Sequence, residues 1–275
     1  RSTLFPYTTL FRSRDNDAGA GGAIFVGGAG LTNYIFQSVF ERNNATTGRG
    51  GAIDWRASAG HILDSNFTEN YAINGGAVYM GGESDSSRIS HVIFDGNVAL
   101  EHGGAIDWNS TGGNLTHTIF KNNKADYGAA LCRESRSTNG FGINNTFIAN
   151  HAYTAGAGLA WMNAQGIKIN NYSFIDNTAG VMGAAIYVNT GSDNCVVFNS
   201  TFENNYILDT TVEGHNGGAI SCEADNLTVN KSAFTNNRAY DGGAIYVGSS
   251  STQAIVANSN FIENKANANG GAIGL

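Results

Sequence analysis

The stretch Ile93–Trp108, IFDGNVALEHGGAIDW, contains two phrases that recur along the chain. The first is Phe-x-x-Asn, which opens here at Phe94, and the second is Gly-Gly-Ala-Ile or a close variant, which ends here at Ile106. Successive copies of the first phrase begin 27, 27, 26, 27, 27, 28, 32 and 27 residues apart. A period held this closely predicts one structural unit that stacks on itself and buries a continuous core.

The Phe-x-x-Asn copies predict two columns of like side chains. Stacked rings gain burial and ring contacts, and stacked Asn amides can hydrogen-bond along the stack. We also expect each Asn to sit at a bend, because Asn tolerates the left-handed backbone conformation. The predicted ring column is Phe40, Phe67, Phe94, Phe120, Phe147, Phe174, Phe202, Phe234 and Phe261. The predicted amide ladder is Asn43, Asn70, Asn97, Asn123, Asn150, Asn177, Asn205, Asn237 and Asn264.

Short alternating apolar runs, such as Ile24-x-Val26 and Val78-x-Met80, predict short strands with one face inward. No 3.6-residue period is present, which excludes helical repeats. Equivalent strands of successive repeats can pair in parallel, ~4.8 Å apart. The sequence therefore predicts an all-β fold, a right-handed single-stranded parallel β-helix (solenoid) of about nine coils of ~27 residues. We expect two or three strands per coil, and the handedness follows from the chirality of parallel-strand connections.

Each Gly-Gly pair is expected to permit backbone angles or a close coil contact that a Cβ would block. Two residues after the hydrophobe of this phrase, alternate coils carry Trp55, Trp108 and Trp161. We expect these indoles to face inward, in a duplicated two-coil unit. Arg133 occupies the same phase, and we expect its side chain to swing out at a strand end.

The two ends of the chain do not fit the repeat. Residues 1–13, RSTLFPYTTLFRS, match neither phrase and hold the single proline, Pro6. The string resembles a translated sequencing-adapter read-through. We therefore predict that residues 1–13 are an adapter-derived artefact outside the fold, and that residues 14–275 are a parallel β-helix repeat domain. The C-terminus falls within a repeat, so we expect this domain to be truncated at both ends.

Composition excludes several function classes. The net charge is −7 with no basic run, which argues against a nucleic-acid partner. No apolar stretch reaches the ~18–20 residues of a membrane helix, so no transmembrane segment is expected in this fragment. The three cysteines lack Cys-x-x-Cys spacing, which disfavours a zinc site. We predict no cofactor and no catalytic, cofactor-binding or metal site, and the sequence carries no signal for an oligomeric state.

One outward row is the candidate ligand surface. The residue after the Gly-Gly-Ala hydrophobe is an aromatic or a carboxylate in several coils: Asp54, Tyr79, Asp107, Tyr187 and Tyr246. Rings can stack on sugar faces and carboxylates can bond hydroxyl groups, so we predict a ligand-facing row.

Two other features stand out. His91 and His117 share a phase in neighbouring coils, and we expect them to stack about 5 Å apart within a polar bend ladder. The largest insertion, Tyr206–Asn216, is expected to project from one face, where repeat proteins often place recognition loops.

The interleaved Gly-Gly-Ala-Ile and Phe-x-x-Asn phrases resemble the polymorphic outer-membrane protein repeat of chlamydial autotransporter adhesins. They are also similar to repeats in adhesin-like surface proteins of gut archaea. The resemblance covers about residues 18–275. It implies a secreted, surface-exposed β-helix used for attachment, located extracellularly or at the cell surface, and associated with the outer membrane if the source is bacterial.

We therefore expect a non-catalytic, adhesin-like segment with a binding or structural role toward extracellular glycans or host surface proteins. One alternative is a β-helix polysaccharide lyase or glycoside hydrolase. Another is a passive stalk that displays an adjoining domain.

Overall fold

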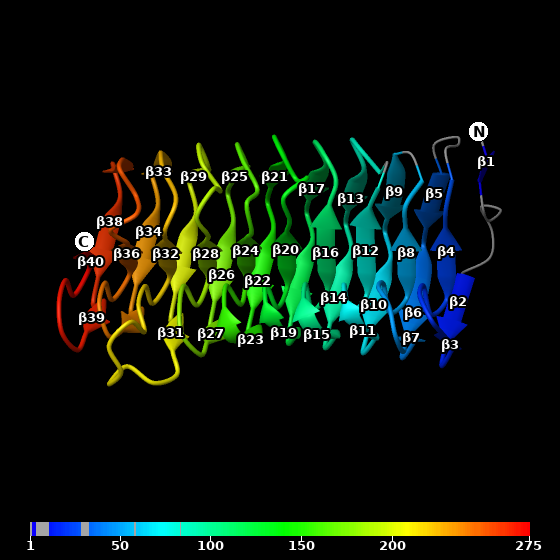
Figure 1. Cartoon of the computed structure of the whole chain (residues 1–275), viewed down its shortest axis with the longest axis horizontal. Helices are drawn as coiled ribbons and strands as arrows, with labels where there is room; N and C mark the ends of the chain where they lie inside the picture. Colours follow the sequence, from blue (N-terminus) through cyan, green and yellow to red (C-terminus); the bar gives the residue numbers. More distant parts are fainter. Residues whose placement is uncertain (1, 4–10, 29–32, 58, 83) are drawn as a thin grey trace.

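The chain forms a rod of stacked coils, with its two termini at opposite ends (Figure 1). The computed structural model describes residues 2–3, 11–28, 33–57, 59–82 and 84–275. Every element in these ranges is a strand. No helix that could cross a bilayer occurs within these ranges. The predicted all-β solenoid is confirmed, with ten coils instead of about nine.

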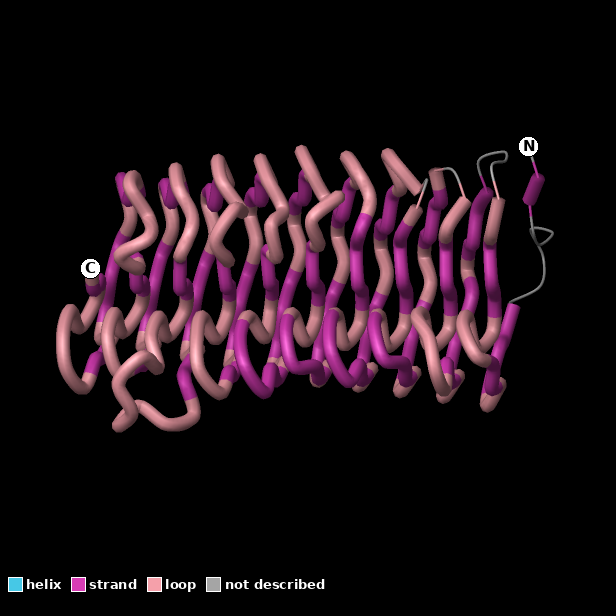
Figure 2. Tube along the Cα trace, viewed as in Figure 1, coloured by secondary structure: helices cyan, strands magenta, loops and turns pink. Residues whose placement is uncertain are grey.

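Each coil holds four short strands, not the two or three expected, and equivalent strands pair in parallel into four sheets of ten. Figure 2 shows these strands separated by bends and loops. Sheet A contains β1 (Ser2–Thr3), β5 (Asn33–Phe36), β9 (Gly60–Leu63), β13 (Arg88–Ser90), β17 (Asn114–Thr116), β21 (Phe141–Ile143), β25 (Lys168–Asn170), β29 (Val196–Phe198), β33 (Leu227–Asn230) and β37 (Ala254–Ala257). Sheet B contains β2 (Phe11–Arg14), β6 (Ser38–Glu41), β10 (Asn66–Thr68), β14 (Ile93–Asp95), β18 (Ile119–Lys121), β22 (Thr146–Ile148), β26 (Ser173–Ile175), β30 (Thr201–Glu203), β34 (Ala233–Thr235) and β38 (Asn260–Ile262).

The other two sheets complete each coil. Sheet C contains β3 (Asp17–Ala18), β7 (Asn44–Ala45), β11 (Tyr71–Asn74), β15 (Val98–His102), β19 (Lys124–Tyr127), β23 (His151–Ala155), β27 (Thr178–Ala179), β31 (Tyr206–Ile207), β35 (Arg238–Ala239) and β39 (Lys265–Ala266). Sheet D contains β4 (Ile24–Val26), β8 (Ile53–Trp55), β12 (Val78–Gly81), β16 (Ile106–Asn109), β20 (Leu131–Arg133), β24 (Leu159–Trp161), β28 (Ile186–Val188), β32 (Ile220–Cys222), β36 (Ile245–Val247) and β40 (Ile273–Gly274).

The predicted ring column runs along sheet B. From Phe40 to Phe261, successive ring centroids lie 4.5–5.0 Å apart with interplanar angles of 2–16°. This spacing matches that of hydrogen-bonded strands, so each ring packs on the ring of the next coil. The prediction is confirmed.

The predicted amide ladder is also confirmed, with one correction. Asn97 donates from its backbone N and its Nδ2 to Asn123 Oδ1, each at 3.0 Å, and Asn123 Nδ2 donates in turn to the Phe94 carbonyl. The ladder asparagines are not the left-handed residues: the residue before each of them is, as at Glu69 (φ 53°) and Ala149 (φ 51°). The Asn side chain instead turns inward, where it satisfies buried backbone groups that the bend leaves unpaired.

The two glycines of each pair have different roles. The first adopts a positive φ, for example 66° at Gly50, and turns the chain from sheet C into sheet D. A Cβ on the second, Gly51, would lie 2.5 Å from the carbonyl oxygen of Tyr71. Both expectations for the pair, an unusual backbone angle and a close coil contact, therefore hold.

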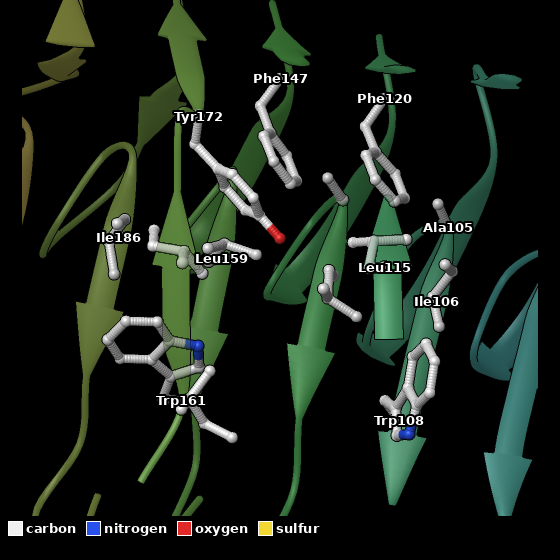
Figure 3. Close-up of a cluster of buried hydrophobic side chains, with 14 of the residues drawn as sticks. Ala105, Ile106, Trp108, Leu115, Phe120, Phe147, Leu159, Trp161, Tyr172 and Ile186 are labelled. Carbon is white, nitrogen blue, oxygen red and sulfur yellow. The ribbon is translucent and has the colours of Figure 1, made fainter. Parts of the chain in front are cut away.

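The main core lies between sheets A, B and D. A second, narrower cluster, mostly of alanines, comes from sheet C and from the turns between sheets C and D. Trp108 and Trp161 are fully buried on one side of the main core, opposite Phe120 and Phe147 (Figure 3). The inward-facing indoles are thus as predicted. Arg133 is not: it is only 3% exposed, its guanidinium lies 4.8 Å from the Trp108 ring, and Nη1 donates to Ser137 at 3.0 Å. A neighbouring indole face and a hydroxyl acceptor allow it to stay inside.

The first described coil includes part of the predicted artefact. Phe11–Arg14 form β2, which pairs in register with β6, and Ser13 takes the phase of the Phe column opposite Phe40. Asn16 extends the amide ladder by one step, since its Nδ2 donates to Asn43 Oδ1 at 2.8 Å. Residues 1 and 4–10 lie outside the described residues, and the division at residue 13 stays a prediction.

Candidate functional site

The predicted ligand-facing row lies on the side of sheet D that faces away from the core. Asp54, Tyr79 and Asp107 are neighbours in three successive strands, with Asp54 paired to Tyr79 and Tyr79 to Asp107. The row is not the exposed surface that we expected. Asp54 is fully buried, Tyr79 and Asp107 are each 3% exposed, Tyr187 is 7% exposed, and Tyr246 is half-buried.

Side chains that precede the glycine pairs shield this row. In successive coils, Arg49 pairs with Asn74, Asn74 with His102, and His102 with Tyr127. Arg49 donates to the Tyr79 hydroxyl at 2.7 Å, and its guanidinium lies 4.6 Å from the Tyr79 ring. Asp54 accepts two hydrogen bonds from Arg56, at 2.9 and 2.7 Å. The polar groups of Asp54 and Tyr79 are therefore engaged within the protein, and a ligand role for the row stays a prediction.

Asp107 lies in a different environment. It lines a cavity of about 180 Å³ together with His102, Glu134, Glu101 and Arg49. Its Oδ1 atom is buried and has no hydrogen-bond partner within the described part of the chain. His102 Nδ1 and Glu134 Oε1 lie 2.5 Å apart at the same cavity. We call His102, Asp107, Cys132 and Glu134 the His102 cluster.

Local irregularities of the repeat assemble this cluster. β15 contains one residue more than the strand on either side of it. On one side, Ala72 and Asn74 of β11 pair with Ala99 and His102 of β15. On the other side, Val98 and His102 of β15 pair with Lys124 and Tyr127 of β19. Such an extra residue redirects the side chains beside it. It places His102 at the end of β15, next to Asp107 of β16. In the following coil, Cys132 pairs with Asp107 across the sheet, and Glu134 follows directly after β20.

Burial and like charges set the protonation of the cluster. Burial raises the pKa of Asp107 well above its ordinary value, and the negative charge of Glu134 raises it further. The hydrogen bond with Glu134 raises the pKa of His102 against the opposing effect of burial. Burial, with added repulsion from Asp107 and Glu134, raises the pKa of the Cys132 thiol. The cluster thus holds an acid that favours its protonated form beside a His–Glu pair.

The donor set combines one imidazole nitrogen, one thiol sulfur and carboxylate oxygens. The donor atoms of His102, Cys132 and Glu134 all lie within 4.8 Å of one another. Chemically, such a set can exchange protons or hold a cation.

Sequence reasoning missed His102 and Glu134 because it compared residues at the same phase, and neither shares the phase of the row. Cys132 shares the phase of Asp107 but is neither aromatic nor acidic, so it was not included. Two signals were present: the extra residue in VALEH before Gly103, and Cys132, which stands in the row where several other coils have an aromatic or a carboxylate.

The other histidine pair behaves as expected. The rings of His91 and His117 are 4.8 Å apart and parallel within 1°, and both residues have positive φ. Asn144 Nδ2 lies 2.9 Å from His117 Nε2, and Asn171 Nδ2 donates to Asn144 Oδ1 at 2.7 Å. This is the polar bend ladder that the sequence predicts.

The insertion after β31 projects from the rod (Figure 1) and borders a second cavity of about 380 Å³. Its lining includes Tyr206, Leu208, Asp176 and Arg238. Tyr206 and Leu208 are 41% and 54% exposed. Thr210 accepts two hydrogen bonds from Asn267 Nδ2, at 2.7 and 3.0 Å, which ties the insertion to a loop two coils further along the rod.

Parallel coils that stack along one axis, each with four short strands, are the architecture of a β-helix. The chain belongs to the right-handed β-helix family, because residues 76–268 match the family described as "Right handed beta helix region". The expected handedness is thereby confirmed.

A more specific likeness is to the protein named "Probable autotransporter YfaL" of Escherichia coli (strain K12), which is 30% identical over 152 residues. That alignment covers 48% of this chain and 12% of the E. coli protein, so the chain spans only a small part of its relative's length. No solved structure matches the chain significantly.

Proposed function

We propose that this chain is part of a surface-exposed or secreted adhesin-like β-helix, and that its role is to bind or present rather than to catalyse. Its partners would be extracellular glycans or host surface proteins. The distant similarity to a probable autotransporter supports a location at the cell surface or outer membrane. The resemblance of the repeat to that of chlamydial autotransporter adhesins supports attachment as the role.

The observation that carries a binding role is the cavity at the insertion. Elsewhere the coils repeat closely, but here the chain adds residues between Tyr206 and Asn216 that form a hollow lined by a half-exposed Tyr ring, an aliphatic side chain, a carboxylate and a guanidinium. A ring beside hydrogen-bonding groups suits an oligosaccharide, which presents apolar ring faces and hydroxyls. Insertions on one face of a solenoid are common places for recognition.

A glycan array compares the wild type with Tyr206→Ala. If the cavity holds the sugar, loss of the ring should cost about 1–2 kcal/mol, or roughly 5- to 30-fold in affinity. Tyr153→Ala is the matched control, because Tyr153 is also an exposed tyrosine of sheet C, at 59% exposure, and lies two coils away. Equal loss in both variants contradicts the assignment of the cavity. Absence of any glycan or protein ligand favours the passive stalk.

The His102 cluster favours a second candidate function, a β-helix lyase or hydrolase acting on polysaccharide. Asp107 is a buried acid with a raised pKa, which is the property of a proton donor. A screen for release of reducing or unsaturated sugars tests this candidate. Product formation that Asp107→Asn abolishes would replace the adhesin proposal.

A further inference from the structure

The His102 cluster brings together four donor groups from two adjacent coils, and His102, Asp107 and Glu134 line the same cavity. His102 and Asp107 come from the coil of β15 and β16, and Cys132 and Glu134 from the coil of β20. Three donor atoms, one each from His102, Cys132 and Glu134, lie within 4.8 Å of one another. Independently of these three, Asp107 is only 3% exposed, lines the same cavity, and has a buried Oδ1 without a hydrogen-bond partner within the described residues.

An unsatisfied buried carboxylate oxygen is unfavourable unless something pairs with it. The nearby groups of like charge, Glu134 and Glu101, cannot do so. Arg49 also lines the cavity, and its Nη1 donates to the Tyr79 hydroxyl. A cation among the four donors would satisfy Asp107 Oδ1 and would favour the ionised form of Asp107, because it offsets the repulsion from Glu134.

The donor types select the class of cation. A site with sulfur and imidazole nitrogen suits divalent first-row transition-metal ions, which are of intermediate softness. Mg²⁺ and Ca²⁺ are hard cations that require oxygen ligands. Zinc binds at about 2.0–2.3 Å to such donors, which puts tetrahedral ligand atoms roughly 3.3–3.8 Å apart. The donor atoms of His102, Cys132 and Glu134, which lie within 4.8 Å of one another, can therefore close on the ion by side-chain shifts of about 1 Å.

We propose that His102, Asp107, Cys132 and Glu134 form a binding site for a divalent transition-metal ion, with Zn²⁺ as its occupant. The ion replaces the direct contact between His102 and Glu134 and takes Asp107 as its fourth ligand. Four protein ligands leave no open position, which is the arrangement of a structural zinc site. The ion links two coils across sheet D, and this role is independent of ligand binding at the insertion, which lies in other coils.

The test is a titration of Co²⁺ into the metal-free wild-type chain, followed by absorption spectroscopy. We expect a thiolate-to-cobalt charge-transfer band that saturates at one equivalent and disappears when Zn²⁺ is added. Cys132→Ala should abolish this band. Cys222→Ala is the matched control and should retain it, because Cys222 is equally buried but faces the core.

Asp107→Asn keeps the thiol and provides a second, independent variant. We expect it to weaken Co²⁺ binding at least about tenfold, with the band still visible at high metal concentration. In thermal unfolding, Zn²⁺ should raise the Tm of the wild type and of Cys222→Ala, but not that of Cys132→Ala. No charge-transfer band at saturating Co²⁺, or a band that survives in Cys132→Ala, overturns the proposal. Circular dichroism of each variant verifies that the coils are intact.

Discussion

Replacing Asn123 with alanine should strongly destabilise the centre of the rod. The Asn123 side chain takes part in four buried hydrogen bonds. Its Oδ1 accepts from Asn97 N and Nδ2, both at 3.0 Å, and its Nδ2 donates to the Phe94 carbonyl at 3.1 Å and to Asn150 Oδ1 at 2.9 Å. At about 1 kcal/mol for each bond, the expected loss in the free energy of unfolding is roughly 3–5 kcal/mol.

Equilibrium unfolding in urea measures this loss, and amide hydrogen exchange localises it. The Asn97 amide loses the acceptor Asn123 Oδ1, so its exchange should accelerate more than that of amides several coils away. Asn171→Gly is the control, because Asn171 belongs to the exposed bend ladder and has a positive φ that glycine accepts. We expect that control to cost less than about 1 kcal/mol. A loss below about 1 kcal/mol for Asn123→Ala, or equal losses for both variants, would refute the view that the buried amides hold the coils together.

Three further predictions concern glycine, a buried cation and pH. Gly103→Ala should cost more than about 3 kcal/mol or prevent folding, because its Cβ would meet the Ile106 carbonyl oxygen at 2.2 Å. Gly28→Ala has a positive φ, but its Cβ would meet no described atom within 4 Å, so it should cost only about 1 kcal/mol; urea unfolding compares the two variants. Arg133→Met should leave the Tm unchanged or higher, since burial already lowers the pKa of Arg133 to about 10, while Arg133→Ala should lower the Tm by leaving a cavity. Burial, and then the charge of Lys124, lower the pKa of His151, so the unfolded chain binds its proton more readily. Stability should therefore fall as the pH drops below about 6.5, and His151→Gln should reduce this slope in urea titrations at several pH values.

The sequence was most informative about side chains that contact their own copies. Phe94 and Asn97 each meet an equivalent residue above and below, so the repeat alone predicts the ring column and the amide ladder. The inward Trp108 follows for the same reason, because strand alternation fixes its face.

The predictions failed where a side chain depends on residues outside its own column. Arg133 shares the phase of the tryptophans, but its position is set by the Trp108 face and Ser137. Tyr79 is bonded by Arg49, which comes from another bend, and Asp54 by Arg56, which is outside the row, so the burial of both depends on side chains of other phases. The His102 cluster depends on one extra residue in β15, whose effect on direction is a property of backbone geometry and not of residue type.

The arrangement of the two termini at opposite ends of the rod has a mechanical consequence (Figure 1). The hydrogen bonds between coils run along the long axis, so a pulling force applied at the ends loads the bonds of the outermost coil first instead of sharing the load among all coils. Release of one coil of 27 residues adds about 90 Å of extended chain but removes only ~4.8 Å of folded length. Under tension the rod should therefore lengthen in regular steps from its ends inward and act as an extensible tether.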